Sequence, residues 1–184
     1  ETEIKYCQIV GPSVFIWKSN KAKFINRNFD KIFSIFSIEK SYYNSDIYDY
    51  IGHPIKNKIY YSNDYNEINN IGIFLGSRQQ EIHKNILIIK KLLLKLKKYK
   101  ELVFNFFVTT EYHEFIKNYF KDNSNIQIHL NDNYYYKKIS KLDFAFACSG
   151  TVHLELCFSN IPHLIFYKAN IINYSIFKLF VRAK

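Results

Sequence analysis

The 184-residue sequence contains no methionine and has only one tryptophan, three prolines, three cysteines and five glycines. No apolar run approaches the roughly 20 residues that a membrane-spanning helix needs, and no basic segment leads into an apolar one as in a signal peptide. Cys7, Cys148 and Cys157 form no CxxC pair, so they predict neither a zinc motif nor a disulfide framework but buried thiols in the cytosol. The absence of methionine and the first residue, Glu1, indicate a fragment of a longer protein.

Positive charge is abundant by contrast. Lysine and arginine number 26 against 16 acidic residues, and the net charge is +10, yet only Arg27, Arg78 and Arg182 are arginine. Such a balance attracts anions, whether nucleic acid, anionic lipid or a phosphorylated substrate, although lysines on solvated faces explain much of it. The few arginines and the core positions of the aromatic residues argue against a nucleic-acid-binding domain, which stays an alternative.

From Ile71 onward, short apolar runs alternate with helical patterns. The expected strands are 71–75, 102–108, 126–130, 144–148 and 163–167, and the expected helices are 79–99, 111–120, 134–140, 151–158 and 172–181. Regular alternation of strand and helix predicts an α/β fold, with a mostly parallel sheet covered by helices on both faces.

The first sixty residues alternate in the same way but supply fewer strands. Strands are expected at 6–10, 32–36 and 48–51, with helices at 20–29 and 39–45. A polar stretch rich in Asn, Tyr and Ser follows. We therefore predict the end of a first α/β domain at 1–56, a linker at 57–70 and a second, Rossmann-like domain at 71–184.

The first candidate binding segment is Gly76-Ser77-Arg78, where a buried strand meets a long helix. Gly76 permits a tight turn, backbone N–H groups at a helix start attract phosphate, and the Arg78 guanidinium can hold two phosphate oxygens. The alternative is structural, with Ser77 as an N-cap and Arg78 on a solvated first turn. A cation at a helix N-terminus is unfavourable, and an anionic ligand there would give it a role.

The second candidate segment runs from Cys148 to Glu155, where another buried strand meets a helix. Ser149 and Thr151 supply hydroxyls, and Gly150 allows a close backbone approach. Glu155 follows Thr151 by four residues and lies on the same helix face, where its carboxylate can accept two hydrogen bonds from a ribose diol. The alternative is a capping box, in which Glu155 serves only the helix start. We expect His153 to be a packing or surface residue.

Several familiar motifs are absent from the sequence. It has no Walker loop, no GxGxxG and no GxSxG elbow. Histidine, cysteine and acidic residues show no metal-ligand spacing, so we expect no protein-bound metal and no cofactor.

Several segments carry a family resemblance in the order in which they occur. They are PSVFIW (12–17), KIFSIFSIEKSYY (31–43), IGHP (51–54), FLGSRQQEI (74–82), FACSGTVHLELCFSNIPHLIFYK (146–168) and YSIFKLFVRAK (174–184). Together they resemble the lipid-A-disaccharide synthase family of GT-B glycosyltransferases, in which FLGSRQQEI corresponds to Leu-Pro-Gly-Ser-Arg-x-x-Glu-Ile. Leu75 stands where that family has proline.

The resemblance implies a GT-B fold and a hexosyltransferase. Its reaction joins UDP-2,3-diacylglucosamine to 2,3-diacylglucosamine 1-phosphate and gives lipid A disaccharide 1-phosphate and UDP. Arg78 is implied as the catalytic residue, facing the donor diphosphate. The implied UDP-binding residues are Gly76, Ser77, Arg78, Ser149, Gly150, Thr151 and Glu155, the last holding the ribose. The family requires no metal in the protein site.

The resemblance also implies a setting for the protein. We expect it in the cytoplasm, peripheral on the inner face of the inner membrane of a Gram-negative-type bacterium. Its expected partners are the UDP-diacylglucosamine donor, the diacylglucosamine 1-phosphate acceptor and the membrane surface, with no nucleic acid. The family's acceptor domain precedes Glu1, so we expect the fragment to be inactive alone. The alternatives are another UDP-sugar GT-B enzyme, such as an N-acetylglucosaminyl transferase or UDP-sugar epimerase, and a decayed, non-catalytic remnant.

Overall fold

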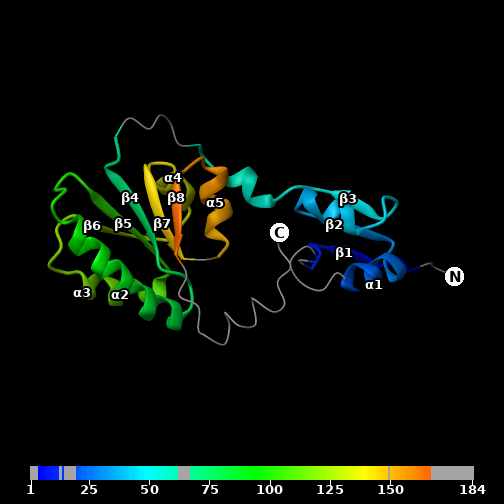
Figure 1. Ribbon diagram of the computed structural model, residues 1–184, viewed down its shortest axis with the longest axis horizontal. Helices are drawn as coiled ribbons and strands as arrows, with labels where there is room; N and C mark the ends of the chain where they lie inside the picture. The colour runs from blue at the N-terminus through cyan, green and yellow to red at the C-terminus, as the bar shows by residue number, and fades with distance from the viewer. Residues whose placement is uncertain (1–3, 13, 15–19, 62–66, 149, 167–184) are drawn as a thin grey trace. The chain divides into compact units, whose positions relative to one another are not determined.

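The computed structural model describes residues 4–12, 14, 20–61, 67–148 and 150–166, which fall into two compact units that divide between Lys56 and Asn57 (Figure 1). The expected helix at 172–181 and the only tryptophan, Trp17, lie outside the described residues. The boundaries predicted for the two domains and the linker stay a prediction.

The first unit holds a small parallel sheet. Strands β1 (Cys7–Ile9), β2 (Lys31–Ser34) and β3 (Tyr48–Tyr50) pair in that order. Helix α1 (Asn20–Asn28) and the 3-10 helix η1 (Ser37–Tyr42) complete it, and the 3-10 helix η2 (Pro54–Lys58) spans the division between the two units. Ala22 and Ile25 of α1 pack with Ile32 of β2 in its core. Of the segment expected as a helix at 39–45, only residues 39–42 are helical, and they form the second part of the 3-10 helix η1.

The second unit is a five-stranded, wholly parallel sheet with helices between the strands. Its strands are β4 (Asn70–Phe74), β5 (Val103–Val108), β6 (Ile126–Leu130), β7 (Phe144–Cys148) and β8 (His163–Phe166), in the order β6-β5-β4-β7-β8. Its helices are α2 (Gln79–Leu96), α3 (Thr110–Tyr119), α4 (Tyr135–Ile139) and α5 (Val152–Phe158). The predicted α/β class, with parallel sheets flanked by helices, is confirmed.

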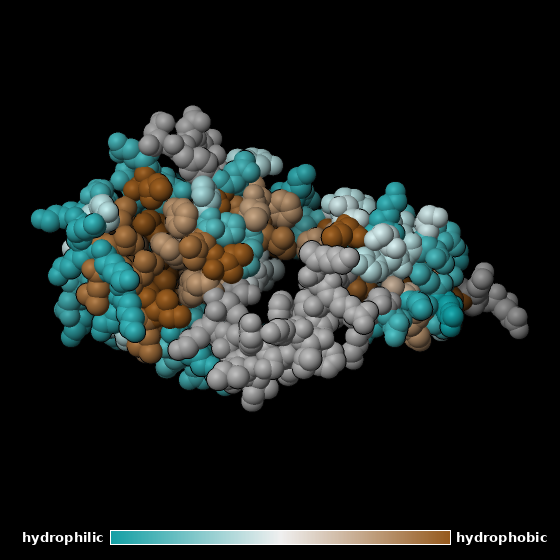
Figure 2. Space-filling model, viewed as in Figure 1, coloured by the Kyte–Doolittle hydropathy of each residue, from teal (hydrophilic) through white to brown (hydrophobic). Residues whose placement is uncertain are grey.

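Helices cover both faces of this sheet because its central strands are apolar on both sides. Ile73 packs in the core under α2 and α3, whereas its neighbour Phe74 packs in the core under α4 and α5. Phe106 and Phe107 divide between the two cores in the same way, as the alternation of side chains along a strand requires. Figure 2 shows further hydrophobic surface on the visible face of this unit, bordered by hydrophilic residues.

The structure also bears on the expected burial of the cysteines and on the presence of membrane-spanning helices. The expectation of buried thiols is confirmed for Cys148 but is wrong for Cys7 and Cys157, which are exposed, because β1 is short and α5 turns position 157 away from the core. Within the described part of the chain, no helix is long and apolar enough to cross a membrane.

Candidate functional site

The strand order places the ends of β4 and β7 side by side. From β4 the sheet first grows through β5 to β6, and β7 and β8 then pair on the other side of β4. Phe74 at the end of β4 pairs with Ala147 in β7. Open parallel sheets bind ligands beyond the carboxyl ends of their strands at such a reversal. Both segments predicted to bind a ligand, 76–78 and 148–155, follow these two strands.

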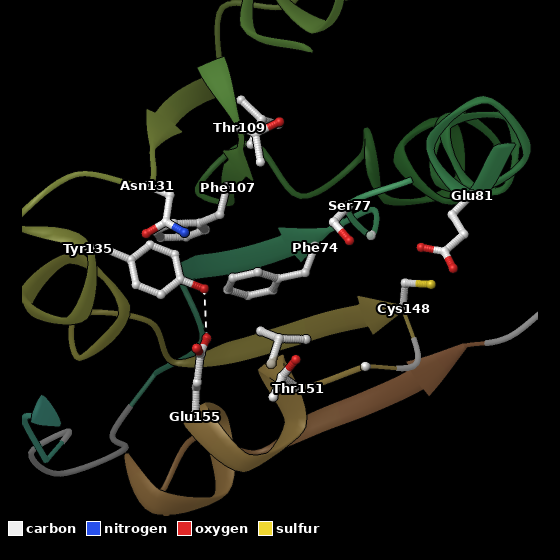
Figure 3. A pocket seen from close by; sticks show the side chains of 14 residues that line it. Phe74, Ser77, Glu81, Phe107, Thr109, Asn131, Tyr135, Cys148, Thr151 and Glu155 are labelled. Carbon is white, nitrogen blue, oxygen red and sulfur yellow. Dashed lines mark hydrogen bonds between the residues drawn. The ribbon is translucent and has the colours of Figure 1, made fainter. Parts of the chain in front are cut away.

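A pocket of about 230 Å³ lies at this reversal (Figure 3). The ends of β4, β5 and β7 contribute to its wall, and Phe74 and Phe107 stack within it with their ring centroids 4.8 Å apart. Of the predicted binding residues, the structure brings five to this pocket, namely Gly76, Ser77, Gly150, Thr151 and Glu155. Ser149 lies outside the described residues. The wall is thus apolar at its base and polar where the two chain segments turn.

Gly76 is required by the turn that leaves β4. Its φ is +101°, a conformation that residues with a side chain rarely adopt. A Cβ atom there would lie 2.7 Å from Oε2 of Glu81, which also lines the pocket. The positive φ therefore favours glycine at this position, and a side chain there would also force the Glu81 carboxylate to shift.

The turn after Gly76 decides whether Ser77 caps helix α2 or lines the pocket. Helix α2 begins at Gln79 with Arg78 as its N-cap residue, and no side-chain hydrogen bond caps it within the described structure. The interpretation of Ser77 as the N-cap is therefore wrong, because the turn places it one residue too early. Its side chain instead lines the pocket (Figure 3).

A buried asparagine anchors the same turn from within α2. The Asn85 side-chain amide donates a 2.8 Å hydrogen bond to the Leu75 carbonyl oxygen, and Asn85 is buried. This bond satisfies a buried backbone acceptor just after the end of β4. The sequence analysis did not predict this hydrogen bond, although a polar residue on the apolar face of the helix pattern indicates a buried hydrogen-bond partner.

Arg78 lies beside the pocket rather than in its wall. Its side chain is 83% exposed, and Nη1 donates to Oε1 of Glu81 at 3.2 Å. Because Glu81 lines the pocket, the Arg78 guanidinium contacts a residue of the pocket wall. An anionic ligand would have to share the guanidinium with the Glu81 carboxylate or displace that carboxylate. The catalytic role of Arg78 stays a prediction.

The second segment presents its carboxylate to the pocket. Helix α5 starts at Val152 with Thr151 as its N-cap residue, and Glu155 lies in its first turn. Tyr135 Oη donates to Glu155 Oε2 at 2.8 Å (Figure 3), and Tyr136 Oη donates to Oε1 at 3.4 Å. Among the described residues, the carboxylate accepts from α4 and from no backbone N–H of its own helix start, so the capping-box interpretation of Glu155 is wrong.

The two tyrosines are functional candidates that the sequence analysis did not identify. Burial, and next the charge of Glu155, raise the pKa of Tyr135 well above its usual value. The same two causes raise the pKa of Tyr136. Both hydroxyls therefore remain protonated donors at neutral pH. No local pattern could have shown this pairing, because Tyr135 and Glu155 are separated by 19 residues and a whole strand.

His153, next to the pocket on α5, is a packing residue. Its ring stacks on His163 with centroids 5.6 Å apart, and both ring nitrogens are buried without a hydrogen-bond partner among the described residues. Burial, followed by the nearby His163, lowers the pKa of His153. Elsewhere in the described ranges, no three His, Cys, Asp or Glu side chains gather in a way that could hold a metal ion.

Known proteins share these sequence features. A family model described as lipid-A-disaccharide synthetase matches residues 1–184. A lipid-A-disaccharide synthase of Campylobacter jejuni (strain RM1221) is 33% identical over 186 residues, which cover 94% of this chain and 48% of that protein. One from Rickettsia prowazekii is 31% identical over 194 residues, covering 98% of this chain and 51% of that protein. The chain spans about half the length of the curated relatives it matches.

Two solved structures show a weaker likeness. A mutant of S. aureus TarM, crystallised with Fondaparinux, alpha-GlcNAc-glycerol and UDP, is 13% identical with a TM-score of 0.46, over 84% of this chain and 34% of that one. Anabaena Alr3699/HepE, in complex with UDP and glucose, is 9% identical with a TM-score of 0.44, over 88% of this chain and 52% of that one. Likeness at this level supports no conclusion about this chain.

Proposed function

The chain belongs to the lipid-A-disaccharide synthetase family, and we propose from this that it is part of a GT-B glycosyltransferase of lipid A biosynthesis. The proposed reaction joins UDP-2,3-diacylglucosamine to 2,3-diacylglucosamine 1-phosphate and releases UDP. One observation carries the proposal for this chain. The pocket at the reversal of the sheet brings together both segments that resemble the family's motifs, although about 70 residues of sequence separate them.

The pocket suits the UDP part of the donor. Gly76 and Ser77 turn the backbone toward the start of the 18-residue helix α2, whose N-terminal N–H groups attract phosphate. Gly150 leaves open space, since a Cβ atom there would meet nothing within 4 Å. We propose that the donor diphosphate lies between these two turns, with Ser149 and Thr151 beside it, and that Glu155 accepts hydrogen bonds from the ribose.

Arg78 is proposed to stabilise the charge that develops on the leaving UDP. A guanidinium aimed at departing phosphate oxygens stabilises the charge that develops on them. Here the Arg78 side chain is exposed and pairs with Glu81, a residue of the pocket wall. On donor binding, Arg78 exchanges its Glu81 partner for the diphosphate, and the charge balance of the site requires no metal ion.

Binding of UDP to this chain, followed by titration calorimetry, tests the proposal. We expect Arg78→Ala to weaken UDP binding about 10- to 100-fold, as the loss of hydrogen bonds to a charged group implies. Arg78→Lys should retain part of the affinity, because it keeps the charge without the planar fork. Arg27→Ala on α1 is the matched control, since Arg27 is also an exposed arginine and lies in the other unit.

Two outcomes would contradict this assignment. A chain that is folded by circular dichroism and binds no UDP would show that this pocket does not hold the donor. Equal losses for Arg78→Ala and Arg27→Ala would show that general positive charge, and not this position, attracts the nucleotide.

We further propose that the protein contacts the membrane surface, on the cytoplasmic side of the inner membrane of a Gram-negative-type bacterium. The supporting observation is the outer face of α2. Leu87 and Leu94 are 56% and 65% exposed there, with Ile88 beside them. Exposed lysines interleave with them on the same face at helical spacing, namely Lys84, Lys91 and Lys95. A helix face of leucine and lysine suits the interface of an anionic bilayer, where acyl-chain substrates also reside.

Co-sedimentation with phosphatidylglycerol and phosphatidylcholine vesicles tests this contact. We expect binding to the anionic vesicles alone, and we expect Leu87→Ser combined with Leu94→Ser to reduce it several-fold, since each leucine buries apolar surface at the interface. Ile38→Ser is the matched control, because Ile38 is 60% exposed in the first unit. Equal binding to both kinds of vesicle, or an equal effect of the control, would contradict the proposal.

A further inference from the structure

The Glu155 carboxylate is held by a second helix before any ligand arrives. Each of its two oxygens accepts one phenolic hydroxyl, Oε2 from Tyr135 at 2.8 Å and Oε1 from Tyr136 at 3.4 Å. The donors lie next to each other at the start of α4, and the acceptor lies in the first turn of α5. The carboxylate is thus positioned from outside its own helix.

Packing fixes the position of the Tyr135 hydroxyl. The Tyr135 side chain is buried in the core under α4 and α5, and its ring meets Phe107 edge to face with centroids 5.6 Å apart. The Tyr135 ring also meets the Tyr136 ring edge to face, with centroids 5.1 Å apart. Phe107 itself is stacked on Phe74 in the pocket wall. The aromatic wall of the pocket therefore determines where the donor to Glu155 lies.

The remaining acceptor capacity of Glu155 matches a pair of neighbouring hydroxyls. An ionised carboxylate has about four lone-pair sites, two on each oxygen. Within the described part of the chain, the two tyrosines are the donors to this carboxylate and occupy one site on each oxygen, so that one site on each is open to a ligand. Two acceptors side by side, facing a pocket, fit the two adjacent hydroxyls of a ribose.

We propose that Tyr135 and Tyr136 are positioning residues that aim the Glu155 carboxylate at the 2′- and 3′-hydroxyls of the UDP ribose, an inference that rests on the proposed function. The selectivity of the pocket for a ribonucleotide then depends on α4 as well as on Glu155. A site built to pair with hydroxyls rejects the analogue that lacks them, because its buried polar groups are left unpaired.

Calorimetric titration of the chain with UDP and with 2′,3′-dideoxy-UDP tests this inference. We expect the unaltered chain to bind UDP at least about tenfold more tightly, as hydrogen bonds to a charged group imply. Tyr135→Phe keeps the ring and removes only the hydroxyl. It should weaken UDP binding about fivefold, the scale of one lost hydrogen bond, and leave dideoxy-UDP binding unchanged. Tyr136→Phe should act in the same direction but less, because its hydrogen bond is longer.

Two controls separate positioning from packing. Tyr134→Phe changes the adjacent, exposed tyrosine and should affect neither ligand. In a Glu155→Gln background, Tyr135→Phe should no longer change the preference for UDP over dideoxy-UDP, because the charged acceptor is gone.

The outcomes distinguish this inference from the proposed function. If Tyr135→Phe weakens both ligands equally, or neither, its hydroxyl does not position a ribose ligand and the inference is overturned. If the unaltered chain binds both ligands equally well, the ribose role of Glu155 fails while nucleotide binding stands. If it binds neither, the proposed donor site fails and the inference fails with it.

Discussion

The turns that follow β4 and β7 have the same place in the fold but differ in how tightly they are constrained. Each leaves a buried strand, contains a glycine and enters a helix beside the same pocket. The β4–α2 turn is constrained, since Gly76 has a positive φ and Asn85 bonds the Leu75 carbonyl. At the β7–α5 turn, a side chain at Gly150 would meet nothing within 4 Å. The β4–α2 turn is thus held by its backbone conformation and by the Asn85 side chain, whereas position 150 has open space beside it.

The charged residues of the two turns show the reverse difference: the exposed one follows the constrained glycine, and the one held by other side chains follows Gly150. Arg78 of the constrained turn carries its charge outward on an exposed side chain and pairs with Glu81. Glu155, beyond the open turn, faces the pocket and is held by two tyrosines. A rigid backbone that presents N–H groups beside a movable cation suits a diphosphate that arrives and leaves. A carboxylate in a fixed position suits a ribose whose two hydroxyls must be recognised by hydrogen bonds.

The largest difference between the turns is expected for their glycines. Gly76→Ala should lower the free energy of unfolding by about 2 to 3 kcal/mol, because alanine at this φ is strained and its Cβ would crowd Glu81. Gly150→Ala, the matched change, should cost less than about 0.5 kcal/mol, as at other positions without special contacts. Urea denaturation measures both. Equal costs would show that the turns are not constrained differently.

The next effect concerns the anchor of the β4–α2 turn. Asn85→Ala should lower the free energy of unfolding by about 1 to 2 kcal/mol, because it leaves the buried Leu75 carbonyl without its donor. Asn118→Ala, on the exposed face of α3, is the control and should change stability by less than about 0.5 kcal/mol. A stability loss no greater than the control's would mean that the turn is held by its backbone alone.

The sequence predicted the layout of the second unit because its signals are local. Apolar runs such as LVFNFFV and FAFAC are two-sided strands, and the three-and-four spacing of Ile82, Ile86 and Ile89 marks the face of α2 that packs on the sheet. Both turns beside the pocket were identified for the same reason, since a glycine that follows a buried strand can be recognised in the sequence. Helix ends were less well predicted, as with α2, which ends at Leu96 rather than near Tyr99.

Side-chain direction and distant pairing could not be predicted in this way. The Arg78 side chain pairs with Glu81 and does not line the pocket, a direction that the residue order alone does not specify. The hydrogen bonds of Tyr135 and Tyr136 to Glu155 depend on how α4 and α5 cross the same face of the sheet. Three consecutive tyrosines look alike in the sequence, and only packing selects which two meet the carboxylate.

The two glutamates of the pocket should have opposite effects on UDP affinity. Glu81→Gln removes a negative charge and frees Arg78, so we expect UDP to bind about two- to fivefold more tightly, the scale of a partly exposed ion pair. Glu155→Gln removes an acceptor for the ribose and should weaken binding. Calorimetry under one salt condition compares them. A decrease for both would show that Glu81 contributes to binding instead of competing with the ligand for Arg78.

The smallest expected effect is a pH dependence of the free energy of unfolding, which arises from His153 in the first turn of α5. Burial lowers the pKa of His153 below its ordinary value of 6.5, so on acidification the unfolded chain takes up a proton before the folded chain does. The free energy of unfolding should therefore fall as the pH decreases through 6.5 toward the lower pKa of the folded state. Burial also lowers the pKa of His129, which acts in the same direction, so His153→Gln should flatten the profile only in part. Urea titrations between about pH 5 and pH 8 span the range in which histidine titrates. A His153→Gln profile parallel to that of the unaltered chain would show that the His153 imidazole does not contribute to the pH dependence, which would then arise elsewhere in the fold, as at His129.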